Sequence, residues 1–358
     1  MIPYSLHSIG NEEIQAVTEV LHSGCLTGGP RVLQFELNFT EYVGAKYAIA
    51  VNSGAGALYL AVKALFPIPG AKIAIPTLTY VATANAVVLA GHIPVFTDVD
   101  PETFCIDPIK IPKDVQGVIP VHHAGHTCNL DIIRESGKWI IIEDAAHACG
   151  AEYKGKKIGS LNTTCFSFHP CKNMTTAEGG MITTNDQELA DRLRRMRLNG
   201  IQKDGLRQDM IDWGFKFNMN EISAAIGIEQ LKKLDGMNER RKDIAERYEK
   251  AFLPLIPFKI KRVQLWDDPS NSNSRHLFPI LVENRDELAA HLKSKGIITA
   301  IHYKPVHLMT WYQKRFGYKE GDFPIAEEVA KHILSIPIYP DMTDDQVDYV
   351  IQSIKEAI

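Results

Sequence analysis

The stretch AIAVNSGAGALYLAVKAL (residues 48–65) joins an apolar run to a Gly-rich loop and then to a helical stretch. Its first four residues, AIAV (48–51), are all apolar, as expected for a strand that is buried on both faces. NSGAGA follows at once and leads into LYLAVKAL without a polar break. This stretch therefore predicts a strand and a helix joined by a Gly-rich turn.

The same alternation continues on both sides of this stretch, from Asn11 to about Met181. The short apolar runs that we expect to form strands are AIAV (48–51), KIAI (72–75), PVFTDV (94–99), VIPV (118–121) and WIIIED (139–144). Helical stretches separate them, which is typical of a mostly parallel sheet with helices on both faces. The predicted fold class is α/β.

The pattern changes around residues 230–252. Apolar residues recur there at steps of three and four, namely Leu231, Leu234, Ile244, Tyr248 and Phe252. This spacing predicts an amphipathic helix long enough to bridge two lobes. Two apolar runs and two helical stretches follow: LFPILV (277–282), a helix from Arg285, ITAI (298–301) and a closing helix from Thr343. We therefore expect a large α/β domain over residues 1–235 and a small C-terminal α+β domain over residues 236–358.

Composition and charge exclude several classes of protein. The 358 residues are 45% hydrophobic and carry a net charge of −4 without a basic tract, so nothing favours nucleic acid or a membrane surface as a partner. No run of about 18 apolar residues is present to span a membrane. The N-terminal MIPYSLHSIGNEE lacks a signal-peptide pattern, and the six scattered cysteines suggest free thiols. We expect a cytoplasmic protein.

Residues with useful chemistry follow four of the expected strands. NSGAGA comes after AIAV, PTLTY with Tyr80 comes after KIAI, and Asp144 closes WIIIED. SFHPCK, which contains Ser167 and Lys172, follows TTCF. Ligands of open parallel sheets bind outside the carboxyl ends of the strands. A phosphorylated aromatic aldehyde bound as an imine would use the Gly-rich turn, the aromatic ring, the carboxylate and the lysine together.

Each feature taken alone has a plainer structural explanation. NSGAGA lacks GxGxxG and the P-loop Gly-Lys-Ser/Thr, so it is also consistent with a tight turn. Asp144 also suits a helix N-cap, and Lys172 a solvated surface charge. A carboxylate that ends an apolar strand is nevertheless costly unless it meets a cation, for which a protonated pyridine nitrogen would serve. A desolvated lysine amine becomes nucleophilic as its pKa falls.

Histidines and cysteines cluster without the spacing of a metal site. The residues concerned are His122, His123, His126, Cys128, His147 and Cys149. Zinc sites favour repeated pairs such as CxxC or HExxH, and neither occurs. We expect no metal, and we expect these histidines to form hydrogen bonds in the site or the core.

Taken together, these segments resemble the sugar aminotransferases, which are pyridoxal-phosphate-dependent enzymes that aminate keto groups of nucleotide-linked sugars. The similarity runs nearly from end to end and is most specific in SFHPCKNMTTAEGG (167–180) and IIEDAAHA (141–148). The resemblance implies the aspartate-aminotransferase-like architecture (fold type I), pyridoxal 5'-phosphate as cofactor and a homodimer.

The resemblance also implies roles for individual residues. Lys172 would bond to the cofactor aldehyde and Asp144 would pair with the pyridine nitrogen, as the two catalytic residues. The other implied cofactor contacts are Tyr80 on the ring face, His147 near the phenolic oxygen, Ser167 with the backbone of Gly54, Ala55 and Gly56 at the phosphate, and Asn218 reaching across the dimer. His302 and Tyr303 resemble a segment near the sugar pocket. Many members have Thr at the position of Ala55, so one hydroxyl contact would be missing here.

The expected reaction moves an amino group from glutamate to a nucleotide-linked keto sugar. IPVHHAG (119–125) and TTAEGG (175–180) are more similar to members that aminate C4 of a 4-keto-6-deoxy or 4-keto pentose sugar. Amination of a C3 keto group and sugar dehydration are the alternatives. The dehydratases carry histidine in place of the lysine, so Lys172 favours transamination. The nucleotide is not encoded in a readable motif, and Arg31 and Arg275 are the candidates for the donor carboxylate.

Overall fold

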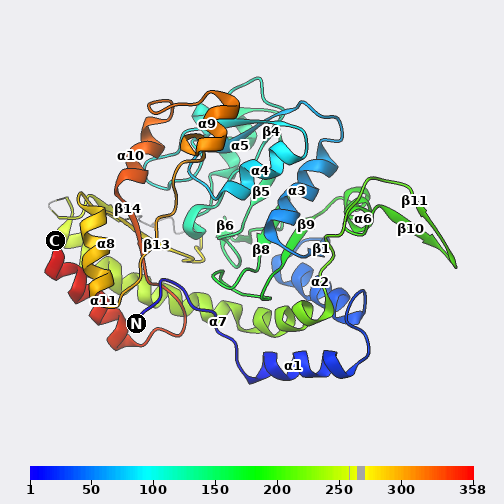
Figure 1. Ribbon diagram of the computed structural model, residues 1–358, viewed down its shortest axis with the longest axis horizontal. Coiled ribbons are helices and arrows are strands. Elements are labelled where there is room, and N and C mark those ends of the chain that lie inside the picture. The colour runs from blue at the N-terminus through cyan, green and yellow to red at the C-terminus, as the bar shows by residue number, and fades with distance from the viewer. Residues whose placement is uncertain (258, 264–270) are drawn as a thin grey trace.

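A seven-stranded sheet forms the centre of the computed structural model, which describes residues 1–257, 259–263 and 271–358 (Figure 1). The strand order is β1-β9-β8-β5-β4-β2-β3, and only β9 among them runs antiparallel to its neighbours. The strands are β1 (Tyr47–Val51), β2 (Lys72–Pro76), β3 (Ile93–Thr97), β4 (Gly117–Val118), β5 (Ile140–Asp144), β8 (Thr163–Ser167) and β9 (Gly180–Thr184). The predicted mostly parallel α/β sheet is confirmed.

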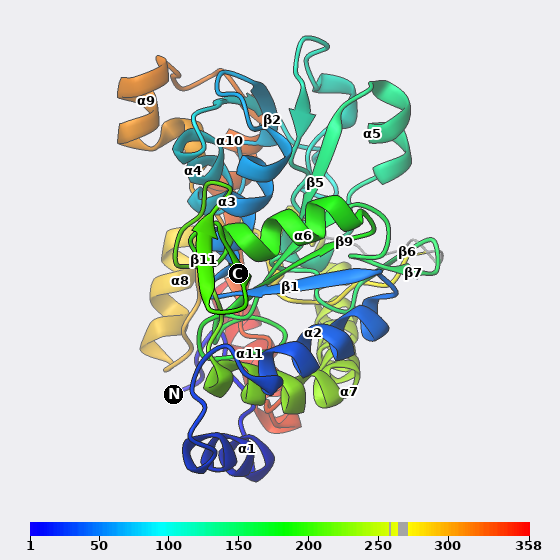
Figure 2. The same cartoon turned by 90° about the vertical axis from the view of Figure 1, so that its right-hand side faces the viewer.

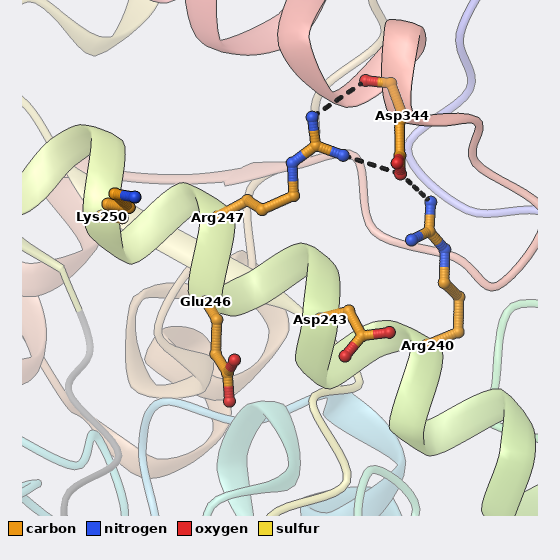
Figure 3. A pocket seen from close by; sticks show the side chains of 6 residues that line it. All are labelled: Arg240, Asp243, Glu246, Arg247, Lys250 and Asp344. Carbon is orange, nitrogen blue, oxygen red and sulfur yellow. Dashed lines mark hydrogen bonds and ion pairs between the residues drawn. The ribbon is translucent and has the colours of Figure 1, made fainter.

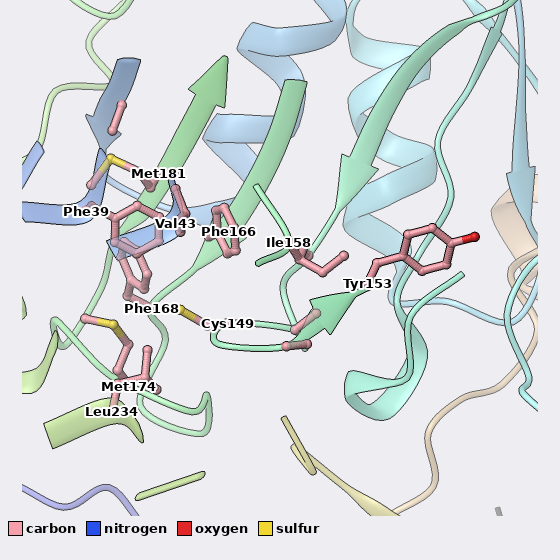
Figure 4. Packing of buried hydrophobic residues seen from close by; sticks show 14 of the residues in the cluster. Phe39, Val43, Cys149, Tyr153, Ile158, Phe166, Phe168, Met174, Met181 and Leu234 are labelled. Atoms are coloured by element: carbon pink, nitrogen blue, oxygen red, sulfur yellow. The ribbon is translucent and has the colours of Figure 1, made fainter. Parts of the chain in front are cut away.

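Helices cover both faces of this sheet (Figures 1 and 2). One face packs against α2 (Pro30–Val43), α5 (Leu130–Ser136) and α7 (Glu221–Phe252). The other face packs against α3 (Gly54–Leu65), α4 (Val81–Leu89) and α6 (Gln187–Met196). Figure 4 shows the first of these cores, in which the ring of Phe39 makes edge contacts with those of Phe166 and Phe168.

Strand β1 shows why its sequence is apolar throughout. Ala48 and Ala50 point into the core on the α2 side, whereas Ile49 and Val51 point into the core on the α3 side. Successive side chains of a strand alternate between the two faces of a sheet, so a strand covered on both faces favours apolar residues at every position. The apolar runs in the sequence predict this arrangement correctly.

Helix α7 begins at Glu221, earlier than the amphipathic pattern around residues 230–252 suggests. Asn220 caps it by accepting a hydrogen bond from the N–H of Ser223 (2.8 Å). The first turns, EISAAIGIE (221–229), pack between α1 (Asn11–His22) and α2, so they carry no polar stripe from which amphipathicity could be recognised. In the part of the chain that the structure describes, no helix has the length and apolarity needed to cross a bilayer.

The C-terminal part builds a second, smaller core. A three-stranded antiparallel sheet packs against the end of α7 and two further helices. These elements are β12 (Arg262–Val263), β13 (Phe278–Leu281), β14 (Ile333–Ile336), α8 (Arg285–Ser294) and α11 (Asp344–Ala357). The run ITAI (298–301) is not a strand, because only Ala300 pairs with β14, through one bridge to Ser335.

Two C-terminal helices, α9 (Thr310–Phe316) and α10 (Pro324–His332), lie over the large sheet in Figure 1. Tyr312 is buried in the core on the α3 side. Buried His307 links the Oγ1 of Thr77, next to β2, at 2.6 Å to the carboxylate of Glu327 in α10 at 3.0 Å. The proposed domain boundary at residue 235 falls inside α7, and this part of the C-terminal segment returns to the large sheet.

The remaining elements are short. Two hairpins are formed by β6 (Glu152–Tyr153) with β7 (Lys156–Lys157), and by β10 (Ile201–Asp204) with β11 (Arg207–Met210). Short 3₁₀ helices lie at Pro108–Lys110, His123–Gly125, Leu253–Leu255 and Val306–Leu308. The β10–β11 hairpin projects away from the body of the molecule (Figure 1).

Candidate active site

Asp144 is the last residue of β5 and is buried beside the middle of the sheet. Thr83 Oγ1 donates a hydrogen bond to its Oδ2 (2.7 Å), and the N–H of Ala146 donates to its Oδ1 (3.1 Å). Burial raises the pKa of Asp144, whereas these two hydrogen bonds and the charge of Lys172 act to lower it. No lysine or arginine among the described residues forms an ion pair with this carboxylate. Asp144 is thus a buried acid poised to receive a cation.

Lys172 follows β8 in the next parallel strand unit, in the loop that leads to β9. Its backbone N–H donates to the carbonyl of His169 (2.8 Å), which holds the loop in a turn. Burial lowers the pKa of the Lys172 amine, and the opposite charge of Asp144 partly offsets the effect. Each of the two groups therefore lies within electrostatic reach of the other, as the sequence predicts for neighbouring strand ends.

The N-terminus of α3 meets the end of β8. A Cβ on Gly54 would lie 2.6 Å from the Cβ of Ser167, so only glycine permits this approach. The Ser53 hydroxyl accepts from the N–H of Gly56 (3.0 Å), which leaves the N–H groups of Gly54 and Ala55 as the first-turn donors that have no acceptor inside the helix. Together with the Ser167 hydroxyl, they form a cradle suited to an anion.

Two tyrosines from different parts of the chain lie close to each other. Tyr80 precedes α4 and is 60% exposed, so its ring is open to a ligand. Tyr303 comes from the segment after residue 300, and its ring centroid lies 6.0 Å from that of Tyr80. The C-terminal segment thus reaches the carboxyl edge of the large sheet.

His147 fixes the orientation of Tyr303. The Nδ1 of His147 accepts from the backbone N–H of Ala124 (3.2 Å), so the ring proton is on Nε2, which lies 2.9 Å from the Tyr303 hydroxyl. Burial and the nearby charge of Lys172 hold the pKa of His147 well below its usual value, which keeps the ring neutral. Since Tyr303 accepts from His147, its own hydroxyl proton remains available to another acceptor.

Further imidazoles surround His147. His276 lies 4.4 Å from it between ring centroids, and the N–H of His123 donates to the carbonyl of His302 (3.2 Å). His302 also contacts the hydroxyl of Ser335 (2.9 Å), and burial lowers its pKa to about 3. Burial lowers the pKa of His123, His147 and His276, and the charge of Lys172 adds to the effect at His147 and His276, so these rings are neutral. His122, by contrast, belongs to the core, where it bonds to Glu143 (2.8 Å).

Asn218 lies beside the end of β1, the strand that leads into the start of α3. It pairs with Val51 at the end of β1, and its side-chain amide donates to the Thr27 hydroxyl (3.1 Å). The two arginines considered for the donor carboxylate are already ion-paired: Arg31 with Glu19 (2.9 Å) and Arg275 with Glu249 (2.8 Å).

Several contributors to this site are absent from the sequence-based prediction. Thr83 follows Tyr80 by three residues in TYVAT (79–83), which is about one helical turn. This spacing from Tyr80 is a sequence signal that could have identified it. His276 belongs to a segment more than a hundred residues from His147 and has no local motif, so only the folded chain brings the two together.

The residues fit pyridoxal phosphate. A buried carboxylate without an ion-pair partner among the described residues suits the protonated ring nitrogen, and the cradle of α3 and Ser167 suits the phosphate. The depressed pKa of Lys172 suits a nucleophilic amine. The donor set therefore matches the group that the resemblance implies.

Residues 7–355 match the DegT/DnrJ/EryC1/StrS aminotransferase family. The chain belongs to this family. SpsC of Bacillus subtilis, a spore coat polysaccharide biosynthesis protein, is 42% identical over 100% of this chain and 97% of its own length. The family assignment establishes a pyridoxal-phosphate-dependent sugar aminotransferase.

Solved structures of sugar aminotransferases share the whole fold. PseC of Helicobacter pylori, an aminotransferase involved in the biosynthesis of pseudoaminic acid, superposes with a TM-score of 0.93 at 29% identity, covering 99% of this chain and 98% of PseC. The pyridoxal-phosphate form of Spr1654 from Streptococcus pneumoniae, a putative sugar aminotransferase, gives a TM-score of 0.93 at 30% identity, with 99% and 98% covered. The expected family, fold type I architecture and cofactor are confirmed.

Proposed function

We propose that this sugar aminotransferase transfers the amino group of glutamate to the C4 keto group of a nucleotide-linked 4-keto-6-deoxy or 4-keto pentose sugar. The observation that carries the proposal is the convergence of Lys172, Asp144 and the start of α3 at one edge of the sheet. The similarity of IPVHHAG (119–125) and TTAEGG (175–180) to C4-acting members supports the position. The relationship to SpsC supports a role in polysaccharide biosynthesis.

Pyridoxal phosphate, when bound, supplies an aldehyde that takes up the amino group and a ring that accepts electron density. Asp144 would hold the proton on the ring nitrogen, and Ser167 with the N–H groups of Gly54 and Ala55 would bind the phosphate. Tyr80 would cover one face of the ring. His147 would hold Tyr303, and Tyr303 with His302 would bind the sugar.

The Lys172 amine would move the proton. As a general base it would take the proton from the Cα of glutamate, and as a general acid it would deliver that proton to the carbon that the cofactor's aldehyde supplies. A lowered pKa serves this purpose, because the amine must be unprotonated to accept the proton near neutral pH. Two half-reactions with one site would give ping-pong kinetics.

We further propose that the enzyme is a homodimer in which Asn218 reaches the phosphate of the neighbouring subunit. Exposed apolar side chains support the dimer: Met210, Ile211 and Phe215 in and after the β10–β11 hairpin, and Leu33 and Leu37 on α2. A second subunit that covers these side chains would remove their apolar surface from water.

The decisive experiment incubates the enzyme and glutamate with a panel of 4-keto and 3-keto nucleotide sugars, and locates the new amine by NMR. We expect an amine at C4 together with stoichiometric 2-oxoglutarate. An amine at C3 would contradict the position, and consumption of the sugar without an amino product would indicate dehydration instead. Lys172→Ala should abolish the product and is the control.

A further inference from the structure

Arg241, in the middle of α7, is a buried arginine that forms no ion pair with any carboxylate of the described residues. It is 3% exposed. Within residues 1–257, 259–263 and 271–358, its Nε meets no hydrogen-bond acceptor, and Nη1 makes a long contact of 3.4 Å with the carbonyl of Met237 in the same helix. The charge of Asp341 acts on it from a distance, while burial lowers its pKa to about 10.

The side of α7 that carries Arg241 faces the active site. Asn238, one helical turn earlier, accepts from the side chain of Asn173 (2.7 Å) and donates to the carbonyl of Cys149 (3.0 Å). Asn173 is the neighbour of Lys172 in the chain, and Cys149 lies two residues after His147. Residues three apart on a helix lie on one face, so Arg241 is directed toward the same region as Asn238.

Electrostatics places Arg241 close to the imidazole group. The charge of Arg241 acts to lower the pKa of His276, as does that of Lys172. The His276 ring in turn lies 4.4 Å from that of His147. The charges of Arg241 and Lys172 therefore both act on His276, the neighbour of His147.

A buried guanidinium without a counter-ion is expensive, because its hydration is lost and nothing replaces it. The planar fork of arginine matches a carboxylate with two parallel hydrogen bonds. The amino donor brings such a group into this site, and the two arginines of the sequence-based expectation already have carboxylate partners in Glu19 and Glu249.

We propose that Arg241 is the donor-binding residue, and that its guanidinium forms a forked pair with a carboxylate of the amino donor. This assignment rests on the proposed transamination from a dicarboxylic amino acid. A phosphate of the nucleotide sugar is also an anion that could pair with Arg241. The test therefore distinguishes a carboxylate ligand from a phosphate ligand.

The test measures binding of glutarate, a dicarboxylate that lacks the amino group, to the pyridoxal-phosphate holoenzyme by calorimetry. In Arg241→Gln we expect glutarate to bind about 100-fold more weakly, because one partner of a buried charge pair is lost. In the same variant, a correspondingly higher concentration of glutamate should be needed to bleach the visible absorbance of the bound pyridoxal phosphate in a single turnover. Uridine and thymidine diphosphate should bind as they do to the unsubstituted enzyme.

Arg240→Gln is the matched control. Arg240 is the neighbouring residue of the same helix, but it lies in a surface hollow between α7 and α11, where it donates to Asp344 (2.8 Å; Figure 3). Its replacement should change the affinity for glutarate less than two-fold. Arg241→Lys keeps the charge without the fork and should bind glutarate about 10-fold more weakly.

The unfolding temperature of the variants distinguishes ligand binding from a structural role. If Arg241 only stabilised the fold, its replacement would lower the unfolding temperature. Without ligand, Arg241→Met should unfold at the same temperature or a higher one, because an unpaired buried charge is removed. Unchanged glutarate affinity in both Arg241 variants, or a selective loss of nucleotide diphosphate binding, would overturn the assignment. Failure of glutamate to react with the unsubstituted enzyme would instead refute the proposed donor.

Discussion

Asp144 depends on a few hydrogen bonds to remain ionised in a buried position. The hydroxyl of Thr83 and the N–H of Ala146 both stabilise the carboxylate, and burial opposes them. A hydrogen bond to a charged group contributes about 1.5–3 kcal/mol, and one pKa unit corresponds to about 1.4 kcal/mol. The loss of one donor should therefore be visible in the pH dependence of the reaction.

Thr83→Val should move the acidic limb of the rate profile to higher pH by about one unit, because the pKa of Asp144 rises when its donor is removed. Since the carboxylate is the form that pairs with the ring nitrogen, activity at a given acidic pH should fall while the plateau above it is kept. The measurement is the rate of the glutamate half-reaction against pH. Thr164→Val is the control, because buried Thr164 bonds to the carbonyl of Asn162 instead (3.1 Å). If the acidic limb of the Thr83→Val profile did not shift, the group that titrates there would not be Asp144.

The residues that follow strands could be predicted from the sequence, whereas those supplied by distant segments could not. Asp144, Ser167 and Tyr80 can be selected from the sequence because the carboxyl ends of parallel strands meet at one edge of the sheet, where ligands bind. His276 and Arg241 carry no local signal, because a single His or Arg in an ordinary segment acquires meaning only from what the fold places beside it.

The start of α3 is the element that joins the cradle to the sheet. Gly54 allows its helix to begin against β8, and β9 comes equally close, since a Cβ on Gly180 would lie 2.4 Å from the carbonyl oxygen of Ser53. The sequence predicts the strand, the turn and the helix here. It does not predict β9, because three of the five residues of the antiparallel strand Gly180–Thr184 are threonine or glycine and the strand carries only two apolar residues.

Gly54→Ala should reduce the affinity for pyridoxal phosphate by at least about 10-fold, because the added methyl group forces α3 away from Ser167. Overpacking of this kind should also cost about 1–3 kcal/mol in the free energy of unfolding. Cofactor titration by absorbance and urea unfolding measure the two effects. In Gly236→Ala, where a Cβ meets nothing within 4 Å, the helix should gain about 0.5–1 kcal/mol and cofactor binding should be unchanged. Equal affinities of Gly54→Ala and Gly236→Ala for pyridoxal phosphate would contradict the proposal that the start of α3 binds the phosphate.

At the level of the whole molecule, the site joins three parts of the chain. The large sheet provides Asp144 and Lys172, the C-terminal segment provides Tyr303, and α7 runs beneath both with Asn238 bonded to Asn173. The proposed second subunit would add Asn218. In the single chain the side chain of Asn218 donates a hydrogen bond to the Thr27 hydroxyl.

Met210→Asp combined with Phe215→Asp should weaken the dimer by about 100-fold or more, because two charges would be buried without partners in an apolar interface. Met210 and Phe215 are 63% and 61% exposed in the single chain. Analytical ultracentrifugation measures the dissociation constant, and turnover should fall as monomers form. Ile109→Asp, at an equally apolar but solitary site, is the control. A monomer with full turnover would contradict the shared site.

The most direct test of the account is the position of the covalent bond to the cofactor. The holoenzyme is reduced with borohydride, digested, and searched by mass spectrometry for the phosphopyridoxyl label. We predict that the label resides on Lys172 in the peptide SFHPCKNM, and that Lys172→Ala abolishes it. Label on another lysine, or none on a holoenzyme that turns over, would contradict the assignment of the active site.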